Sequence, residues 1–288
     1  MAHPTQRTDG SVASLWRYPV KSMLGEELDA AELGERGVLG DRAYALLDRI
    51  DGKVASAKNP RKWPRMFEFH AEFAAPVHRG TEVPPVRITL PDGTLLISDQ
   101  ADVDEVLSRA LQREVTLQAA EQDRRGVVES TVPNPWLAQA EEYWPDMEGL
   151  DYRDTVTDFD LPEGTFFDAA VVHLLTTATL GRLHELYPEG RFDVRRFRPN
   201  VVVEAADGAE DFVENAWVGR TVRIGDGVRV AVTGPCPRCV MTTLPQGDLP
   251  KDAGILRTAA RHNGVNVGVY AGVLQGGRIH RGDPITVE

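Results

Sequence analysis

The chain has 288 residues, of which 42% are hydrophobic and 26% are charged, and these fractions are typical of a globular protein. A membrane-spanning helix needs about 18 consecutive apolar residues, and the sequence contains no run of that length. The net charge of −12 disfavours nucleic acids and anionic membranes as partners. Residues 1–10 are polar and lack the apolar core of an export signal, so we expect a cytoplasmic location.

The first 120 residues are predicted to be β-rich. Asp51-Gly52 and Asp92-Gly93 are typical two-residue hairpin turns, and each separates two segments of strand-like composition. A helix capped by Ser98 is expected next, because Val103 and Leu107 begin a stripe of apolar residues on one helical face. The strands are expected at 11–20, 42–50, 53–58, 66–74, 86–90 and 94–98.

Residues 120–165 are acidic and contain several prolines and aromatic residues, which indicates a long connection that would act as a lid if ordered. A helix from Thr177 to Leu186, capped by Thr176 or Thr177, is expected in the second half, after an apolar segment at 169–175. Further strands are expected at 201–204, 221–224, 228–232, 265–274 and 284–287, with a helix at 252–261. We therefore divide the chain into a domain at 1–120, a connection at 121–165 and a domain at 166–288.

The two cysteines, Cys236 and Cys239, lie in a proline-rich segment after the strand expected at 228–232. We expect an irregular loop here, in which Arg238 favours the thiolate of Cys239. Four interpretations remain open: a redox pair, a zinc site, two inert thiols, or a single thiolate that binds a metal held mainly by an organic cofactor. No helix pattern begins at the cysteines and no paired histidines occur, so the last interpretation fits best.

Several basic residues stand at the ends of predicted strands. They are Lys21, Arg42, Arg195, Arg196 and Arg198. Basic side chains at strand ends can converge on one anion. The alternative is that each pairs with one of the many surface carboxylates, and for any single arginine this alternative is favoured.

An ordered set of short motifs resembles one known family. The motifs are Tyr18-Pro-Val-Lys-Ser22, Gly40-Asp-Arg42, Phe197-Arg-Pro-Asn200, Pro235-Cys-Pro-Arg-Cys239-Val-Met-Thr-Thr243 and Gly282-Asp-Pro284. In this order they resemble the MOSC-domain proteins, and among them the amidoxime-reducing component branch. The resemblance implies a β-rich α+β fold: an N-terminal β-barrel-like domain followed by a β-barrel MOSC domain with a few helices.

The resemblance also implies a site. It implies a molybdenum–pyranopterin cofactor whose metal is bound by Cys239, which is then also the catalytic residue. It assigns cofactor-binding roles to Lys21, Ser22, Arg42, Arg198, Asn200 and Arg238. Pyridoxal phosphate binding is a further property attributed to this family. Pro237, Ala169 and Ala170 depart from residues found in some relatives, so these positions offer no polar side chain.

The implied activity is the two-electron reduction of N-hydroxylated small molecules. The chain has no iron–sulfur, flavin or nicotinamide motif, so we expect a separate donor of the ferredoxin or flavin reductase type. The alternative function is a carrier, in which Cys239 holds a persulfide or the protein passes on the molybdenum cofactor without turnover of its own.

Overall fold

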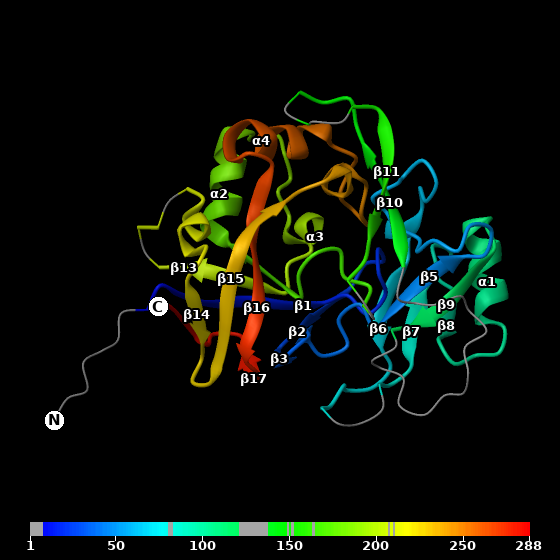
Figure 1. The fold of residues 1–288 in the computed structure, drawn as a ribbon, viewed down its shortest axis with the longest axis horizontal. Helices are drawn as coiled ribbons and strands as arrows, with labels where there is room; N and C mark the ends of the chain where they lie inside the picture. Colours follow the sequence, from blue (N-terminus) through cyan, green and yellow to red (C-terminus); the bar gives the residue numbers. More distant parts are fainter. Residues whose placement is uncertain are drawn as a thin grey trace.

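The largest sheet of the computed structural model closes into a barrel of seven strands (Figure 1). The structure describes residues 8–79, 83–120, 138–148, 150, 153–162, 165–206, 208–209 and 211–288. The barrel strands are β1 (Gly10–Arg17), β12 (Val172–Thr176), β13 (Val201–Ala205), β14 (Thr221–Ile224), β15 (Val228–Pro237), β16 (Asn266–Gln275) and β18 (Pro284–Val287). Their order is β13-β12-β16-β15-β14-β18-β1, and pairing of β1 with β13 closes the barrel. β2 (Glu26–Leu28) extends the sheet from β1.

The barrel interior is filled by β-branched and leucine side chains from alternating strand positions. Val203, Val230 and Val269 are fully buried representatives of this cluster. Such residues pack well on a pleated surface with one face toward a core. Because β1 comes from the start of the chain, the barrel depends on residues from both ends of the sequence.

The rest of the first half forms small sheets around a second core. The elements are β3 (Ala30–Gly34), β4 (Gly37–Val38), β5 (Tyr44–Asp48), η1 (Met66–Glu68), β6 (His70–Phe73), β7 (Val86–Thr89), β8 (Leu95–Ile97), α1 (Val103–Leu111) and β9 (Val115–Ala119). β5 pairs with β9, and β6, β7 and β8 form one sheet. Trp63, Phe67 and Phe69 are buried in this second core, and the partly buried side chain of Cys239 packs against it.

Short helices cover one end of the barrel (Figure 1). These helices are α2 (Thr177–Leu186), α3 (Val194–Phe197), η4 (Val213–Trp217), η5 (Val240–Thr243) and α4 (Ala253–Asn263). After α4 and β16, strand β17 (Gly277–His280) pairs with β3. Thr176 caps α2 by accepting a hydrogen bond from Thr179 N, which satisfies a free helix N–H. Gly264 ends α4 in the left-handed conformation, with φ 54°.

The predicted fold class, β-rich α+β, is confirmed, and the predicted α2 and β18 agree with the structure. The hairpin at Asp92-Gly93 is confirmed by the pairing of β7 with β8. The cap at Ser98 was wrong: α1 begins at Val103, and the Ser98 hydroxyl instead accepts from Val86 N across the hairpin. The strand at 53–58 was also wrong, since only Val54 forms bridges there.

Two longer segments differ from the expectation. The acidic connection contains an antiparallel hairpin of β10 (Gln139–Trp144) and β11 (Thr155–Asp160), and residues 121–137 lie outside the described part. The cysteine segment is not a loop up to Cys239. β15 continues to Pro237, because shifts in its pairing with β16 accommodate the prolines. The division into domains at 120 and 165 stays a prediction.

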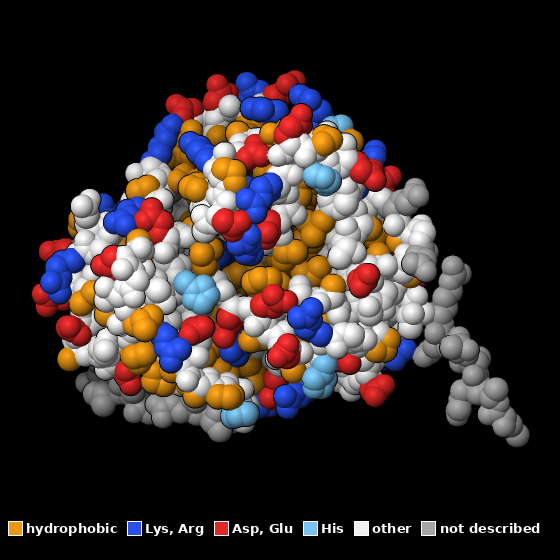
Figure 2. Space-filling model, turned by 180° about the vertical axis from the view of Figure 1, so that it is seen from behind, with side chains coloured by type: hydrophobic (Ala, Val, Ile, Leu, Met, Phe, Trp, Pro, Cys, Tyr) orange, Lys and Arg blue, Asp and Glu red, His pale blue; other side chains and the backbone are white. Residues whose placement is uncertain are grey.

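The surface mixes charges of both signs. Seen from behind, acidic and basic side chains are interspersed, and hydrophobic side chains gather near the centre of the face (Figure 2). The net charge of −12 therefore does not form one continuous acidic face on this side. Within the described residues, no helix combines the length and apolarity needed to cross a membrane.

Arg196 fastens the segment that follows Cys239. Its side chain is fully buried and donates to four backbone carbonyls, those of Arg191, Thr242, Leu244 and Pro250. Three of these carbonyls belong to η5 and the chain after it. A planar guanidinium with five N–H groups suits several carbonyl acceptors at once.

Replacing Arg196 by Met should lower the free energy of unfolding by more than about 3 kcal/mol, because each buried acceptor left without a donor costs about 1–3 kcal/mol. Arg220→Met is the control, since exposed Arg220 also donates to two carbonyls. It should change stability by less than about 1 kcal/mol. Urea unfolding measures both, and equal effects would contradict the role of Arg196.

Candidate functional site

A cavity of about 250 Å³ lies between the barrel and the first half of the chain. All seven site residues named from the motifs line it: Lys21, Ser22, Arg42, Arg198, Asn200, Arg238 and Cys239. The structure thus brings together residues separated by up to 218 positions, from Lys21 to Cys239. Arg195 and Arg196 do not line the cavity, because Arg195 pairs with Asp193 and Asp248 and Arg196 binds carbonyls.

The Asp41 carboxylate joins three of the motifs. It is buried, and it accepts hydrogen bonds from Tyr18 N at 2.8 Å and Asn200 Nδ2 at 2.8 Å. It also forms an ion pair with the adjacent Arg42. Asn200 Oδ1 in turn accepts from His173 N at 3.1 Å. The carboxamide of Asn200 is therefore occupied by protein groups on both sides.

Two guanidinium groups lie against the ring of Tyr18. Arg42 is 4.7 Å and Arg198 is 4.1 Å from the ring centroid, which are cation–π distances. Arg198 donates to Met23 O at 2.6 Å, but no described carboxylate lies within ion-pair distance of it. Burial and the nearby Arg42 lower the pKa of Arg198 to about 10, so it still carries its charge at neutral pH.

Four residues that line the cavity have positive φ: Ser22 at 64°, Arg42 at 51°, Arg198 at 53° and Val265 at 69°. In the described chain, only seven non-glycine residues do so. This conformation is costly for residues with a side chain and is concentrated at functional sites. For Val265, a β-branched residue, it is a clear outlier. The backbone around the cavity is thus held in a strained arrangement by its surroundings.

Three charged residues of the cavity were missed in the sequence: Lys58, Glu142 and Asp168. Asp168 forms ion pairs with Lys21 and, at 3.6 Å, with Lys58. Lys58 also pairs with Glu142 at 3.2 Å. Burial would raise the pKa of Asp168, but Lys21 and Lys58 hold it well below its usual range. The one available signal was the rarity of lysine: the chain has five, at 21, 53, 58, 62 and 251, and two of them line the cavity.

The side chain of Arg238 contacts Cys236 and not Cys239. Its Nη1 donates to Cys236 Sγ and its Nη2 to Phe197 O. Burial opposes ionisation of Cys236, but Arg238 and His173 lower its pKa to about 6. Burial raises the pKa of Cys239 to about 11, although Lys58 opposes the shift. Arg238 also lowers the pKa of Cys239, as expected, but burial outweighs this effect, and the hydrogen bond of Arg238 goes to Cys236.

Several positions show what kind of group the cavity could hold. Cys239 is partly buried and lines the cavity, whereas Cys236 is fully buried behind its wall. Pro237, Ala169 and Ala170 line it without polar side chains, as expected. In the described residues, no three His, Cys, Asp or Glu side chains are grouped to hold a metal ion by themselves.

Comparisons with known proteins define the class. The MOSC domain model matches residues 162–286, and the model of the MOSC N-terminal β-barrel domain matches residues 9–139. The chain belongs to the MOSC-domain family, with the N-terminal β-barrel domain preceding the MOSC domain. The match of the N-terminal model includes β1, which closes the barrel of the second half.

Individual relatives are distant. The chain is 26% identical over 252 residues to mitochondrial amidoxime reducing component 2 of Macaca fascicularis, covering 82% of this chain and 67% of that protein. The YuaD protein of Bacillus subtilis is 11% identical, with a TM-score of 0.45 and coverage of 96% of this chain and 94% of that one. YiiM of Geobacillus stearothermophilus is 22% identical, with a TM-score of 0.31 and coverage of 41% and 54%.

The two cysteines should differ in charge in the metal-free protein. Cys236 ionises as the pH rises through about 6, so its thiolate should be present at neutral pH, and Cys239 should ionise only near about 11. The thiolate ultraviolet absorbance at neutral pH should be lost in Cys236→Ser and retained in Cys239→Ser. Acidification below about 6 should remove it from the unmodified protein. Loss of the signal in Cys239→Ser instead would overturn the assignment.

Proposed function

We propose that the cavity binds a molybdenum–pyranopterin cofactor, with Cys239 as the metal ligand, and that the protein reduces N-hydroxylated small molecules with electrons from a separate donor. The observation that carries the proposal is the convergence of the separated motifs on one cavity, in which buried Arg198 has no described carboxylate within ion-pair distance. Membership of the MOSC family supports it, as does the similarity to an amidoxime reducing component.

The donor groups of the cavity fit such a cofactor. Buried Arg198 has no described carboxylate within ion-pair distance, and Arg238, whose charge Cys236 balances, has a buried Nε without a hydrogen-bond partner. A buried cation is stable only when it is compensated, so an anionic ligand is expected here. The phosphate of the pterin cofactor supplies such an anion, and guanidinium groups bind phosphate through paired hydrogen bonds.

We assign roles to the residues that line the cavity. Lys21, Arg42 and Arg198 would hold the phosphate. The hydroxyl of Ser22 accepts from Ala57 N and keeps its own proton free to donate to the pterin. Asn200 would act mainly by holding Asp41, because its carboxamide is already engaged.

Cys239 would provide the soft thiolate ligand to molybdenum. Its raised pKa means that metal binding must release the thiol proton, so binding should strengthen as the pH rises. When bound, the cofactor supplies two-electron chemistry at an oxygen atom. Reduction of N–OH to N–H consumes two electrons and two protons and releases water.

The cavity also contains groups suited to a flat polar substrate. Trp144, Phe167 and Tyr270 line it, and Lys58 is the cation that most strongly favours the thiolate of Cys239. Burial opposes the charge of Lys58, but Asp168, Cys239 and Glu142 raise its pKa. Lys58 would therefore donate a hydrogen bond to a substrate oxygen rather than give up a proton. Binding of pyridoxal phosphate stays an expectation that the resemblance to the family implies. The two lysines of the cavity, Lys21 and Lys58, are both paired with Asp168.

Cys239→Ser should abolish reduction of an amidoxime driven by a chemical reductant and should lower the molybdenum content, because a hydroxyl is a poor ligand for a soft metal. Cys236→Ser should keep its molybdenum, since Cys236 does not line the cavity. Metal analysis and product formation measure both. Equal molybdenum in Cys239→Ser and the unmodified protein would remove the ligand assignment. Full molybdenum without turnover under any reductant would favour the carrier function.

Arg198→Ala should weaken cofactor retention by about 1–3 kcal/mol, the range for a hydrogen bond to a charged group. Arg278→Ala is the control, because Arg278 is exposed and does not line the cavity. Retention is measured as the pterin remaining after dialysis. If both variants lose the same amount, Arg198 does not bind the cofactor.

A further inference from the structure

The hairpin formed by β10 and β11 supplies one wall of the cavity. Glu142 and Trp144 on β10 line the cavity, as does Leu150, which follows β10 in the chain. None of the three belongs to the motifs from which the site residues were named. The hairpin therefore adds side chains to the cavity that the proposed binding of the cofactor does not use.

Residues 53–62 hold the hairpin in place. Two backbone hydrogen bonds of 2.8 Å join this segment to β10. Glu141 pairs with Lys53 at 3.1 Å and with Lys62 at 3.3 Å. Neighbouring residues of a strand point to opposite faces, and the next residue, Glu142, lines the cavity. The position of the Glu142 side chain is therefore fixed by contacts outside the cavity.

The Glu142 carboxylate retains an oxygen that can accept a hydrogen bond. The residue is buried, with only 9% of its surface exposed. Its Oε2 accepts from Lys58 Nζ at 3.2 Å, and no described residue donates to its Oε1. An ionised carboxylate accepts hydrogen bonds on both oxygens, and buried acceptors are normally satisfied. Glu142 therefore offers an acceptor to an N–H group of a molecule bound in the cavity.

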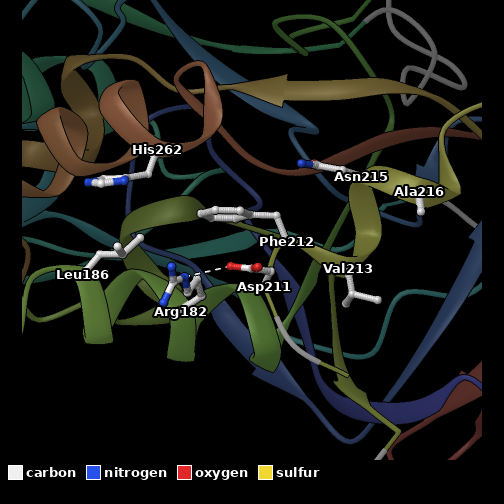
Figure 3. Close-up of a pocket in the computed structure, with 8 residues that line it drawn as sticks. All are labelled: Arg182, Leu186, Asp211, Phe212, Val213, Asn215, Ala216 and His262. Carbon is white, nitrogen blue, oxygen red and sulfur yellow. Dashed lines mark ion pairs between the residues drawn. The ribbon is translucent and has the colours of Figure 1, made fainter. Parts of the chain in front are cut away.

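The hollow beside α2, of about 460 Å³, differs in this respect. Figure 3 shows its lining residues, among which Arg182 of α2 pairs with Asp211 at 2.7 Å. Asp211 is exposed, and it is the one carboxylate among the described residues that line this hollow. The hollow therefore presents no buried acceptor comparable to Glu142.

Lys58 presents a donor beside this acceptor. Its ammonium group pairs with Glu142 and, at 3.6 Å, with Asp168, and it lies 4.4 Å from the ring centroid of Phe159 on β11. Among side chains, Lys58 and Glu142 have the largest effects on the pKa of Cys239: Lys58 lowers it and Glu142 raises it. Both charges therefore lie near the Cys239 sulfur, with the donor and the acceptor side by side.

The charges on this side of the cavity are balanced. Two lysines pair with two carboxylates here: Lys21, Lys58, Asp168 and Glu142. Trp144 adds an aromatic wall, and its Nε1 donates to Thr157 Oγ1 at 2.8 Å, which holds the ring in place. Electrostatic complementarity then favours an uncharged, flat ligand that carries an acceptor and a donor of its own.

We propose that Glu142 is a specificity-determining residue, through which the protein selects substrates that carry an N–H group beside the N–OH group. This inference rests on the proposed function. Glu142 would accept a hydrogen bond from the N–H group, while Lys58 donates to the oxygen that leaves. N-hydroxyamidines and N-hydroxyguanidines have both groups, whereas tertiary amine N-oxides have no N–H group.

Neither residue has to give up or take up a proton in this role. The N–O bond breaks, an N–H bond forms and water leaves, while the separate donor supplies two electrons and the solvent supplies two protons. The neighbouring N–H group is not altered by the reaction, so Glu142 can hold it throughout. Its contribution should therefore appear in the binding of the substrate.

The test compares benzamidoxime with N,N-dimethylbenzamidoxime, in which two methyl groups replace the amino hydrogens. Calorimetry measures the binding of each compound to the purified protein, whose molybdenum content is determined, without a reductant and therefore without turnover. Glu142→Leu removes the acceptor, and Glu142→Gln keeps a neutral one. Asp158→Asn is the control, because exposed Asp158 is a carboxylate of the same hairpin that does not line the cavity.

The unmodified protein and the control should bind benzamidoxime about tenfold or more tightly than the dimethyl compound, because a hydrogen bond to a charged acceptor is lost with the N–H group. This preference should disappear in Glu142→Leu and be reduced in Glu142→Gln. Thermal unfolding checks that each variant folds, and Glu142→Gln alone decides if Glu142→Leu does not. An unchanged preference in the folded variants, or equal binding of the two compounds by the unmodified protein, would overturn the proposal.

Turnover with a chemical reductant separates this inference from the proposed function. If the molybdenum-loaded protein reduces neither compound, the proposed reduction fails, but a binding preference that depends on Glu142 would still support its role in selecting the ligand. If reduction occurs, Glu142→Leu should raise the KM for benzamidoxime by about tenfold. A loss confined to kcat would contradict a role in binding.

Discussion

The buried carboxylate of Asp41 is the interaction on which the arrangement of the site depends. An isolated buried charge is costly, and it is tolerated only when hydrogen bonds and an opposite charge surround it. Here the backbone of Tyr18, the guanidinium of Arg42 and the amide of Asn200 provide this compensation. Tyr18 directly follows β1, Arg42 lies between β4 and β5, and Asn200 directly precedes β13. One side chain therefore fixes the relative position of the two halves of the chain at the cavity.

The same requirement for compensation explains the strained backbone. Arg42 and Arg198 reach the Tyr18 ring from opposite halves of the sequence, and both have positive φ. Each such residue costs about 1–3 kcal/mol, which the surrounding contacts must offset. The result is a set of buried cations held in place before any ligand arrives. A preorganised site of this kind loses little entropy on binding an anion.

Local signals in the sequence predicted the elements that depend on local interactions. Thr176 caps α2 with its own neighbour Thr179, and Asp92-Gly93 needs only its adjoining strands. The errors arose where distant partners decide. Ser98 bonds Val86 across a hairpin rather than capping a helix. Lys58 and Asp168 meet only through the fold, 110 positions apart in the sequence. The site residues could be named from short motifs, but the hydrogen bond from Arg238 to Cys236 could not be predicted, because both cysteines lie within reach of its side chain.

The two cysteines differ in pKa because their side chains lie in different surroundings. Cys236 lies behind the cavity wall, where Arg238, His173 and Tyr270 surround its sulfur and favour the thiolate. Cys239 faces the cavity with a pKa of about 11 and is therefore a neutral thiol until something displaces its proton. A soft metal does so, since it binds the thiolate and releases the proton. Arg238, whose charge Cys236 balances, then remains beside the cavity without competing for Cys239. The fully buried cysteine thereby helps to hold an arginine in place, and the partly buried one stays available as a ligand.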